Sequence, residues 1–153
     1  MAVLTNLRGL RLKENKLTGE LISELGLLTN LEELTLGFNE FIKPIPSEIG
    51  LLTELVTLNL EQNRFSGNIP TQMGLLSNLE NLYLSKLLTR GSIPTQFGGL
   101  MALQTLQLFE SGLDGKIPTE LGNAMDLNRL DLKGNKLSGP LPSELGLATD
   151  LCK

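Results

Sequence analysis

The chain contains no histidine and only one cysteine, Cys152. Without histidine, a serine or cysteine nucleophile has no imidazole base, and one thiol can form neither an internal disulfide nor a thiol-based zinc site. We therefore expect no enzyme activity, no metal site and no cofactor. Cys152 is interpreted as a bystander.

Long apolar runs are also missing. No stretch reaches the roughly 18 apolar residues that a membrane helix needs, and the opening MAVLTNLRGL lacks the apolar segment of a secretion signal. Neither a membrane span nor an intact signal peptide is predicted. The formal net charge of -4 argues against nucleic acid as a partner, because phosphate-binding surfaces are normally strongly basic.

What the sequence has instead is a repeat of 24 residues without insertions. Leucine returns at Leu7, Leu31, Leu55, Leu79, Leu103 and Leu127, and two more complete leucine columns follow three and five residues later. Glycine is equally regular at Gly26, Gly50, Gly74, Gly98, Gly122 and Gly146. A fixed period of this size predicts a solenoid. We expect one domain over 1–153, with repeats at 7–30, 31–54, 55–78, 79–102, 103–126 and 127–150.

Both ends of the sequence match parts of the same unit. Residues 1–6 correspond to the end of one repeat, and residues 151–153 to the start of another. A solenoid is normally closed by caps with a polar outer face, and no such cap is predicted here. The favoured interpretation is a fragment of a longer protein; the alternative is that neighbouring chains cover the ends.

Each position within the unit has a local physical role. The alternation L-x-L predicts a short strand with inward leucines, so that stacked coils form a parallel sheet. A second extended segment and a proline lead into a short helical turn, whose N-caps are expected at Ser23, Ser47, Thr71, Thr95, Thr119 and Ser143. A structural asparagine ladder, in which the amides satisfy backbone groups of the turns, is predicted at Asn15, Asn39, Asn63 and Asn135.

These columns, written LxxLxLxxNxLxGxIPxxLGxL, resemble the plant-type leucine-rich repeat over essentially the whole chain. The resemblance implies an α/β solenoid: a right-handed superhelix of about six repeats, with a parallel β-sheet on the concave face and short 3-10 or helical turns on the convex side. Such repeats form the ectodomains of receptor-like kinases and receptor-like proteins, form polygalacturonase-inhibiting proteins, and occur in algal proteins. The resemblance implies binding of a protein, peptide or glycan, usually outside the cell or at its surface.

The repeat that begins at Leu79 departs most from this pattern. Leu87 stands where the ladder asparagine belongs, and Thr89 stands in a core leucine position. Ser111 replaces the asparagine of the next repeat. One interpretation is a one-residue shift that lets Leu88 fill the core place of Thr89. The irregularity itself is interpreted either as drift or as a distortion related to binding.

A candidate partner-binding surface follows from the residues that alternate with the inward leucines. Tyr83 and Phe109 lie on neighbouring predicted strands, diagonal to one another, and exposed rings tend to anchor partners. The alternative is that the two rings pack together or against Leu88. The polar residues expected to border them are Asn59, Glu61, Gln107, Arg129, Asp131 and Lys133, which could equally be solvated surface groups.

Three functions are compatible with these features. The leading hypothesis is a non-enzymatic recognition module that presents its concave sheet to a protein or peptide. The alternative is a scaffold subunit that docks through its ends into a larger assembly, and a minor alternative is ice or mineral-surface binding by the regular Ser/Thr column. The acidic and amide residues of the convex turns are explained by the preference of such side chains for the start of a helix. They form one convex row, whereas a catalytic carboxylate pair faces across a cleft.

Overall fold

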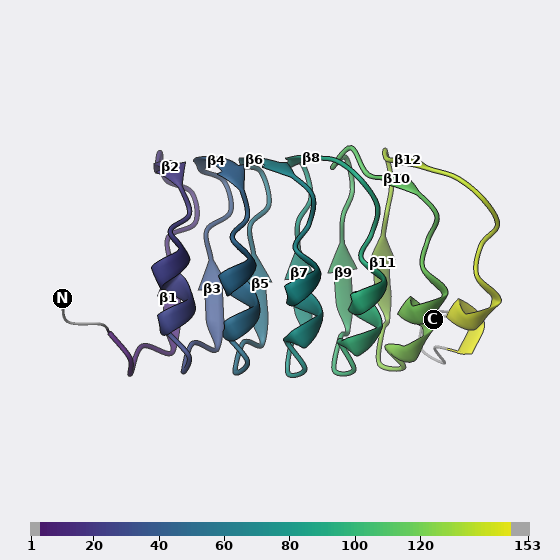
Figure 1. Ribbon diagram of the computed structural model, residues 1–153, viewed down its shortest axis with the longest axis horizontal. Helices are drawn as coiled ribbons and strands as arrows, with labels where there is room; N and C mark the ends of the chain where they lie inside the picture. The colour runs from purple at the N-terminus through teal and green to yellow at the C-terminus, as the bar shows by residue number, and fades with distance from the viewer. Residues whose placement is uncertain (1–3, 148–153) are drawn as a thin grey trace.

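The computed structural model describes residues 4–147 and forms one coil for each 24-residue repeat (Figure 1). Each coil contributes one strand to a six-stranded first sheet, in the order β1-β3-β5-β7-β9-β11. Neighbouring strands are parallel and pair residues 24 apart, as Leu34 with Leu58. The strands are β1 (Gly9–Arg11), β3 (Glu33–Thr35), β5 (Thr57–Asn59), β7 (Asn81–Tyr83), β9 (Thr105–Gln107) and β11 (Arg129–Asp131).

The leucines of the L-x-L pattern build the core beneath this sheet. Leu34, Leu58, Leu82 and Leu106 are completely buried. In the first coil Leu12 is 36% exposed, whereas Leu36 in the same column is 1% exposed. The difference arises because each inner coil is covered on both sides. The predicted leucine-rich solenoid with a parallel sheet is confirmed.

A second set of strands runs along the top of the molecule in Figure 1. Its register differs from that of the first sheet, because paired residues are 22 apart, as Gly19 with Phe41. This sheet is interrupted between β8 and β10, so that β10 pairs with β12 alone. The strands are β2 (Thr18–Glu20), β4 (Glu40–Pro44), β6 (Arg64–Gly67) and β8 (Leu88–Thr89), then β10 (Asp114–Gly115) and β12 (Lys136–Leu137).

Short 3-10 turns form the convex side, in front of the first sheet in Figure 1. The expectation that Ser or Thr caps them is wrong. In η2 the N-cap is Pro46, in an extended conformation, and the Ser47 hydroxyl hydrogen-bonds Glu48 Oε2 at 3.1 Å. Proline fixes φ and begins the turn one residue earlier. The turns are η1 (Ser23–Leu27), η2 (Ser47–Leu51), η3 (Thr71–Leu75), η4 (Thr95–Gly99), η5 (Thr119–Asn123) and η6 (Ser143–Leu147).

The glycine column lies where these turns approach each other most closely. A Cβ atom built on Gly74 would lie 2.3 Å from the backbone oxygen of Gln96 in the next coil. At Gly50 the corresponding distance, to Gln72 O, would be 2.4 Å. Both distances are far inside van der Waals contact, so the spacing between coils depends on the missing side chain.

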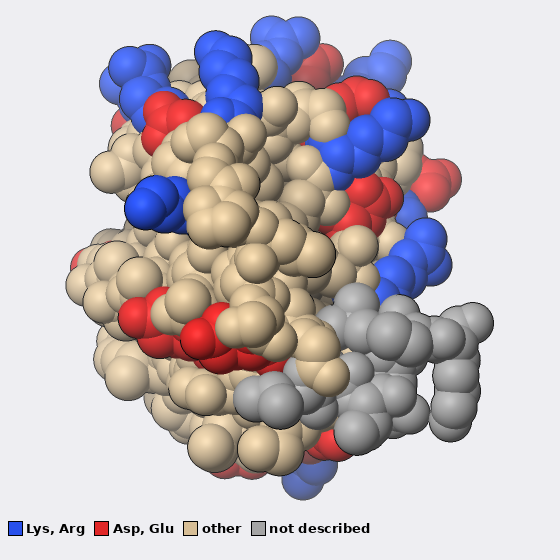
Figure 2. Space-filling view, turned by 90° about the vertical axis from the view of Figure 1, so that its right-hand side faces the viewer, with Lys and Arg blue, Asp and Glu red and all other residues tan. Residues whose placement is uncertain are grey.

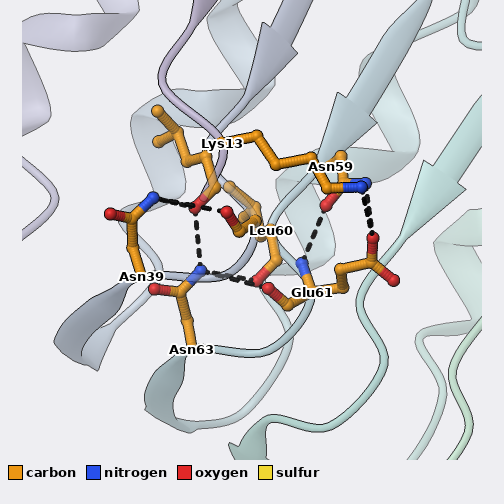
Figure 3. A network of polar contacts seen from close by, with 8 residues as sticks. Lys13, Asn39, Asn59, Leu60, Glu61 and Asn63 are labelled. Atoms are coloured by element: carbon orange, nitrogen blue, oxygen red, sulfur yellow. Dashed lines mark hydrogen bonds and ion pairs between the residues drawn. The ribbon is translucent and has the colours of Figure 1, made fainter. Parts of the chain in front are cut away.

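Asparagine side chains join adjacent coils on the inner side of the turns that follow the first-sheet strands. Asn63 Nδ2 donates to Leu36 O and to Leu60 O, both at 3.0 Å (Figure 3). Its Oδ1 accepts from Phe41 N–H at 3.1 Å. One buried amide therefore satisfies backbone groups of two coils, as a neutral side chain with both donors and an acceptor can.

The irregular fourth coil keeps the register of its neighbours. Leu88 is 62% exposed and Thr89 only 5%, so the expectation that Leu88 moves into the core is wrong. Thr89 is accommodated because its Oγ1 donates to Ser111 O at 2.6 Å. Ser111 Oγ in turn donates to Leu84 O at 2.7 Å, and Leu87 fills its own place as a buried apolar group. The hydroxyl groups at positions 89 and 111 are thus both satisfied by backbone oxygens of neighbouring coils.

Asn63→Ala is expected to lower the free energy of unfolding by about 2 to 4 kcal/mol, because it leaves several buried backbone groups without a partner. The measurement is urea denaturation followed by circular dichroism. Asn15→Ala is the matched control, since exposed Asn15 donates to the carbonyls of Leu12 and Lys13 within its own turn. Equal losses in the two variants would contradict a role in joining coils.

Candidate functional site

The outward residues of the first sheet line a broad hollow of about 510 Å³. We call it the concave hollow. It extends over five consecutive coils and is lined by Arg11, Lys13, Glu33, Thr35, Thr57, Asn59, Glu61, Tyr83 and Gln107. These side chains stand on paired strands, so the surface they form is held by the backbone hydrogen bonds of the sheet.

Asn59, Glu61 and Lys13 form a polar network in the lining of the hollow (Figure 3). Asn59 Nδ2 donates to Glu61 Oε1 at 2.9 Å, and Asn59 Oδ1 accepts from Glu61 N–H at 3.1 Å. Lys13 Nζ lies 3.5 Å from Glu61 Oε1 although it stands two coils away. Gly37, in the coil between, leaves the room: a Cβ there would lie 2.4 Å from Asn59 Oδ1.

Ion pairs between neighbouring coils border the hollow on its N-terminal side. Arg11 binds the Glu33 carboxylate with two hydrogen bonds: Nε donates to Oε1 at 2.7 Å, and Nη2 donates to Oε2. Arg8 pairs with Glu32. The hydrogen bond from Arg11 lowers the pKa of the Glu33 carboxyl and raises the pKa of Arg11. Because both arginines are exposed and both glutamates are only partly buried, the pairs orient charge on the surface and add little to stability.

Tyr83 and Phe109 occupy different environments. Tyr83, half-buried on β7, lies in register between Asn59 and Gln107 and lines the concave hollow. Half-buried Phe109 follows β9 outside the lining, and Lys86 Nζ lies 5.8 Å from its ring centroid. Within residues 4–147 the stacked pair of rings is Phe41 with Phe65 in the core, so the two candidate anchors do not stack on each other.

The remaining predicted residues divide between the hollow and the sheet beyond it. Gln107 is 9% exposed, and with its amide oxygen turned toward Arg129 it accepts from Arg129 Nε and Nη2 at 3.1 and 3.2 Å. Asp131 Oδ1 accepts from Lys133 N–H at 3.1 Å. Thus Asn59, Glu61, Tyr83 and Gln107 come together in one hollow, whereas Phe109, Arg129, Asp131 and Lys133 lie outside its lining.

Five residues of the hollow were not among the predicted site residues. They are Arg11, Lys13, Glu33, Thr35 and Thr57. The sequence repeat does indicate these five residues, because each stands in the same outward-facing columns as the predicted residues. The scarce aromatic residues drew the prediction toward the fourth and fifth coils, whereas the hollow is centred nearer the N-terminus.

Charge is distributed unevenly over the molecule. The segments that follow the first-sheet strands and form the top edge are 13–20, 37–44, 61–68, 85–92, 109–116 and 133–140; they include Lys13 and Glu61 of the concave hollow and together carry nine basic and six acidic residues, a formal charge of +3. The rest of residues 4–147 carries three basic and ten acidic residues, a formal charge of -7. Figure 2 shows the basic side chains gathered along the top and acidic ones on the side of the 3-10 turns.

The positive excess of this edge lies in its last three segments. The first three hold four basic and four acidic residues, and the last three hold five basic and two acidic residues. We call these five basic residues the basic patch; they are Lys86, Arg90, Lys116, Lys133 and Lys136. All five are exposed.

No group of three or more His, Cys, Asp and Glu side chains among residues 4–147 could hold a metal ion. In the same residues, no helix has the length and apolar character needed to cross a bilayer.

The stacked coils, parallel first sheet and asparagine ladder define a leucine-rich solenoid, and comparison with known proteins agrees. The family model described as Leucine Rich Repeat matches residues 30–52, 54–76 and 126–147. The ectodomain of the receptor kinase SOBIR1 from Arabidopsis thaliana is 34% identical, with a TM-score of 0.80 over 86% of this chain and 73% of that chain. The chain belongs to the leucine-rich-repeat family.

Longer receptor ectodomains are similar as well. That of the plant membrane receptor kinase GASSHO1/SCHENGEN3 from Arabidopsis thaliana is 40% identical, with a TM-score of 0.91, and the match covers 94% of this chain and 17% of that chain. The Arabidopsis receptor kinase HAESA is 33% identical, with a TM-score of 0.91 over 96% of this chain and 25% of that chain. The chain therefore spans a quarter or less of these two ectodomains. Comparison with curated proteins finds no match.

Proposed function

We propose that this chain is a recognition module that binds a protein or peptide on the concave face of the first sheet. The observation that carries the proposal is the concave hollow. One aromatic ring and polar side chains from five consecutive coils line it together, and they stand on or beside paired strands. Structures of similar proteins support it. GASSHO1/SCHENGEN3 was solved in complex with CASPARIAN STRIP INTEGRITY FACTOR 2, and HAESA with the peptide hormone IDA and the co-receptor SERK1.

The lining of the hollow favours an extended segment that crosses several strands. Tyr83 offers an apolar ring with a polar tip, the kind of side chain that is enriched at the centre of interfaces. Arg11 with Glu33, and Lys13 with Glu61, are ion pairs that could exchange partners with charged groups of a ligand. A matching ligand has one apolar side chain for Tyr83 and charges of both signs nearby.

Tyr83→Ala is expected to weaken binding about tenfold or more, because an anchoring ring at the centre of an interface contributes roughly 1.4 kcal/mol or more. The probe is an extended peptide selected from a displayed random library on the intact chain, and its Kd is measured by calorimetry. Phe109→Ala is expected to weaken binding less, since Phe109 lies outside the lining.

Gln96→Ala is the control for this experiment, because Gln96 is exposed on the convex side in η4. It should keep the wild-type Kd. If both ring variants also keep that Kd, the concave hollow is not the binding surface. The scaffold alternative makes a different prediction: the isolated chain should aggregate or unfold, and a stable, soluble monomer would count against it.

A further inference from the structure

The convex side of the solenoid exposes one large apolar side chain near the end of the 3-10 turn in each of five consecutive coils. The exposed fractions of these side chains lie between 51% and 67%. We call them the convex row; they are Leu27, Leu51, Leu75, Met101 and Met125. The turns and the first sheet form opposite sides of the coils, so the row is separate from the concave hollow (Figure 1). Exposed apolar groups gathered on one face mark an interaction surface.

The row is kept although its position in the repeat changes. In the first three coils a leucine ends the turn, and the residue two places later is polar: Thr29, Thr53 and Ser77. In the fourth coil Gly99 ends the turn, and a Cβ there would lie 2.6 Å from Gly74 O. Leucine has no room at this position, and Met101, two places later, supplies the apolar group. The fifth coil has the same arrangement, with Asn123 at the end of the turn and Met125 after it.

The charge around the convex row has one sign. Segments 21–31, 45–55, 69–79, 93–103, 117–127 and 141–147 contain six acidic residues and no lysine or arginine. Three of the acidic residues belong to the first two coils and three to the last two: Glu24, Glu48, Glu54, Glu120, Asp126 and Glu144. None of their carboxylates lies within 4.0 Å of a basic nitrogen among residues 4–147. The row therefore has an uncharged middle and unpaired acidic groups toward both ends.

We propose that the convex row binds a partner protein through a cationic amphipathic α-helix. The apolar face of the helix contacts the row, and lysine or arginine side chains in its first and last turns pair with the carboxylates at the two ends. The same carboxylates repel an anionic bilayer or a nucleic acid, so the charge of this side selects a cationic segment. The site is independent of the concave hollow, and neither proposal requires the other.

The spacing of the coils favours a helix over an extended segment. Paired strands of adjacent coils are about 4.8 Å apart, so five coils span about 19 Å. An α-helix has a pitch of 5.4 Å and can offer one apolar side chain per turn, within about 0.6 Å of the coil spacing, and about 13 residues cover the row. In an extended peptide, side chains on one face repeat every 6.6 Å or so and fall out of step by about 1.8 Å at each coil.

The described part of the chain does not supply such a helix. The helical elements among residues 4–147 are 3-10 turns of five residues. The cations of the basic patch lie on the top edge, where exposed Glu110 and Asp114 stand among them. A second copy of the chain therefore lacks the matching surface, and the occupant is a different protein.

The test uses a fluorescein-labelled synthetic peptide of about 16 residues, with leucines at i, i+3, i+4 and i+7 on one helical face and lysines in the first and last turns. Its Kd for the intact chain is measured by fluorescence anisotropy. The double variant Leu75→Ser, Met101→Ser should raise this Kd at least about tenfold, because these side chains lie in the middle of the row. The matched control Ile42→Ser, Leu88→Ser removes side chains of the second sheet that are 40% and 62% exposed, and it should keep the wild-type Kd.

A second pair of variants tests the carboxylates. The triple variant Glu24→Gln, Glu120→Gln, Asp126→Asn should weaken binding severalfold, and more at low than at physiological salt. The matched control Glu14→Gln, Glu110→Gln, Asp114→Asn removes the same charge from exposed positions of the top edge and should have little effect. Equal weakening in the two triple variants would overturn the site, because it would show attraction by overall charge. Circular dichroism checks that every variant is folded.

Three further peptides and one measurement on the chain alone test the occupant. Equally tight binding of a scrambled peptide without an apolar face, or of one with a central proline, would overturn the helix, and equally tight binding of a peptide with glutamate in place of lysine would overturn the role of charge. Absence of binding by the wild-type chain would overturn the proposal itself. Sedimentation should show a monomer; a dimer that Leu75→Ser, Met101→Ser dissociates would mean that a second copy covers the row. Tyr83→Ala should leave binding of the helical peptide unchanged, which separates this test from that of the concave hollow.

Discussion

Replacing Gly74 with alanine is expected to lower the free energy of unfolding by about 4 kcal/mol or more, among the largest effects of a single methyl group. The added Cβ would lie 2.3 Å from Gln96 O and 2.7 Å from Gln96 C. These are backbone atoms, so no side-chain rotation can relieve the contact. The turns η3 and η4 would have to separate, and the core between two coils would open.

The same column supplies the control. Gly146 occupies the equivalent position in the last described turn, and a Cβ built there meets no described atom within 4 Å. Gly146→Ala should therefore be neutral or stabilising by up to about 1 kcal/mol, because alanine favours helical backbone over glycine. Urea denaturation of both variants measures the difference. If Gly146→Ala costs as much as Gly74→Ala, glycine is required for its backbone conformation and not for close approach.

Phe65→Ala is expected to cost about 3 to 5 kcal/mol, since it removes a completely buried ring and leaves a cavity. Phe65 stacks on Phe41 at a centroid distance of 5.9 Å and an interplanar angle of 6°. The ring therefore fills the space beneath the second sheet in its own coil and supports the coil before it. Thermal and urea denaturation both report the loss.

Leu17→Ala is the matched control, because Leu17 occupies the same column in the first coil and is 38% exposed. It should cost about 1 kcal/mol, in proportion to the smaller area removed from water. Comparing the double variant Phe41→Ala, Phe65→Ala with the two single variants measures the coupling free energy of the rings, which we expect to be about 0.5 to 1.5 kcal/mol. Similar losses in Leu17→Ala and Phe65→Ala would contradict the assignment of the core to the inner coils.

Most of the fold could be predicted because each structural position has one dominant physical cause. Leu34 and Leu36 are buried on one side of a strand and Thr35 is turned outward, as alternation requires. The start of the 3-10 turns could not be predicted in this way. Serine and threonine favour the N-cap, but the preceding proline already fixes the extended residue that the cap position needs.

The candidate site was less predictable, because it depends on long side chains that cross coils. The contact of Lys13 with Glu61 joins residues 48 positions apart, and a Cβ on Gly37 in the coil between would lie 3.1 Å from Glu61 Cγ. The sequence columns identify which side chains turn outward, but they do not determine how those side chains pair. The prediction follows the aromatic rings of the fourth and fifth coils, so it includes Glu61 of the third coil but omits Arg11, Lys13 and Glu33 of the first two.

The interruption of the second sheet between β8 and β10 has a consequence for cooperativity. Stability in a stacked array is approximately the sum of the coils and of the contacts between neighbours, so the weakest contact decides where the array divides. Between the fourth and fifth coils the first sheet is continuous, whereas in the second sheet β8 and β10 are not paired, and Asp114 N–H donating to Gly91 O at 2.9 Å takes the place of regular strand pairing. We expect amide hydrogen exchange to show two cooperative units, with the boundary beside Thr89 and Ser111.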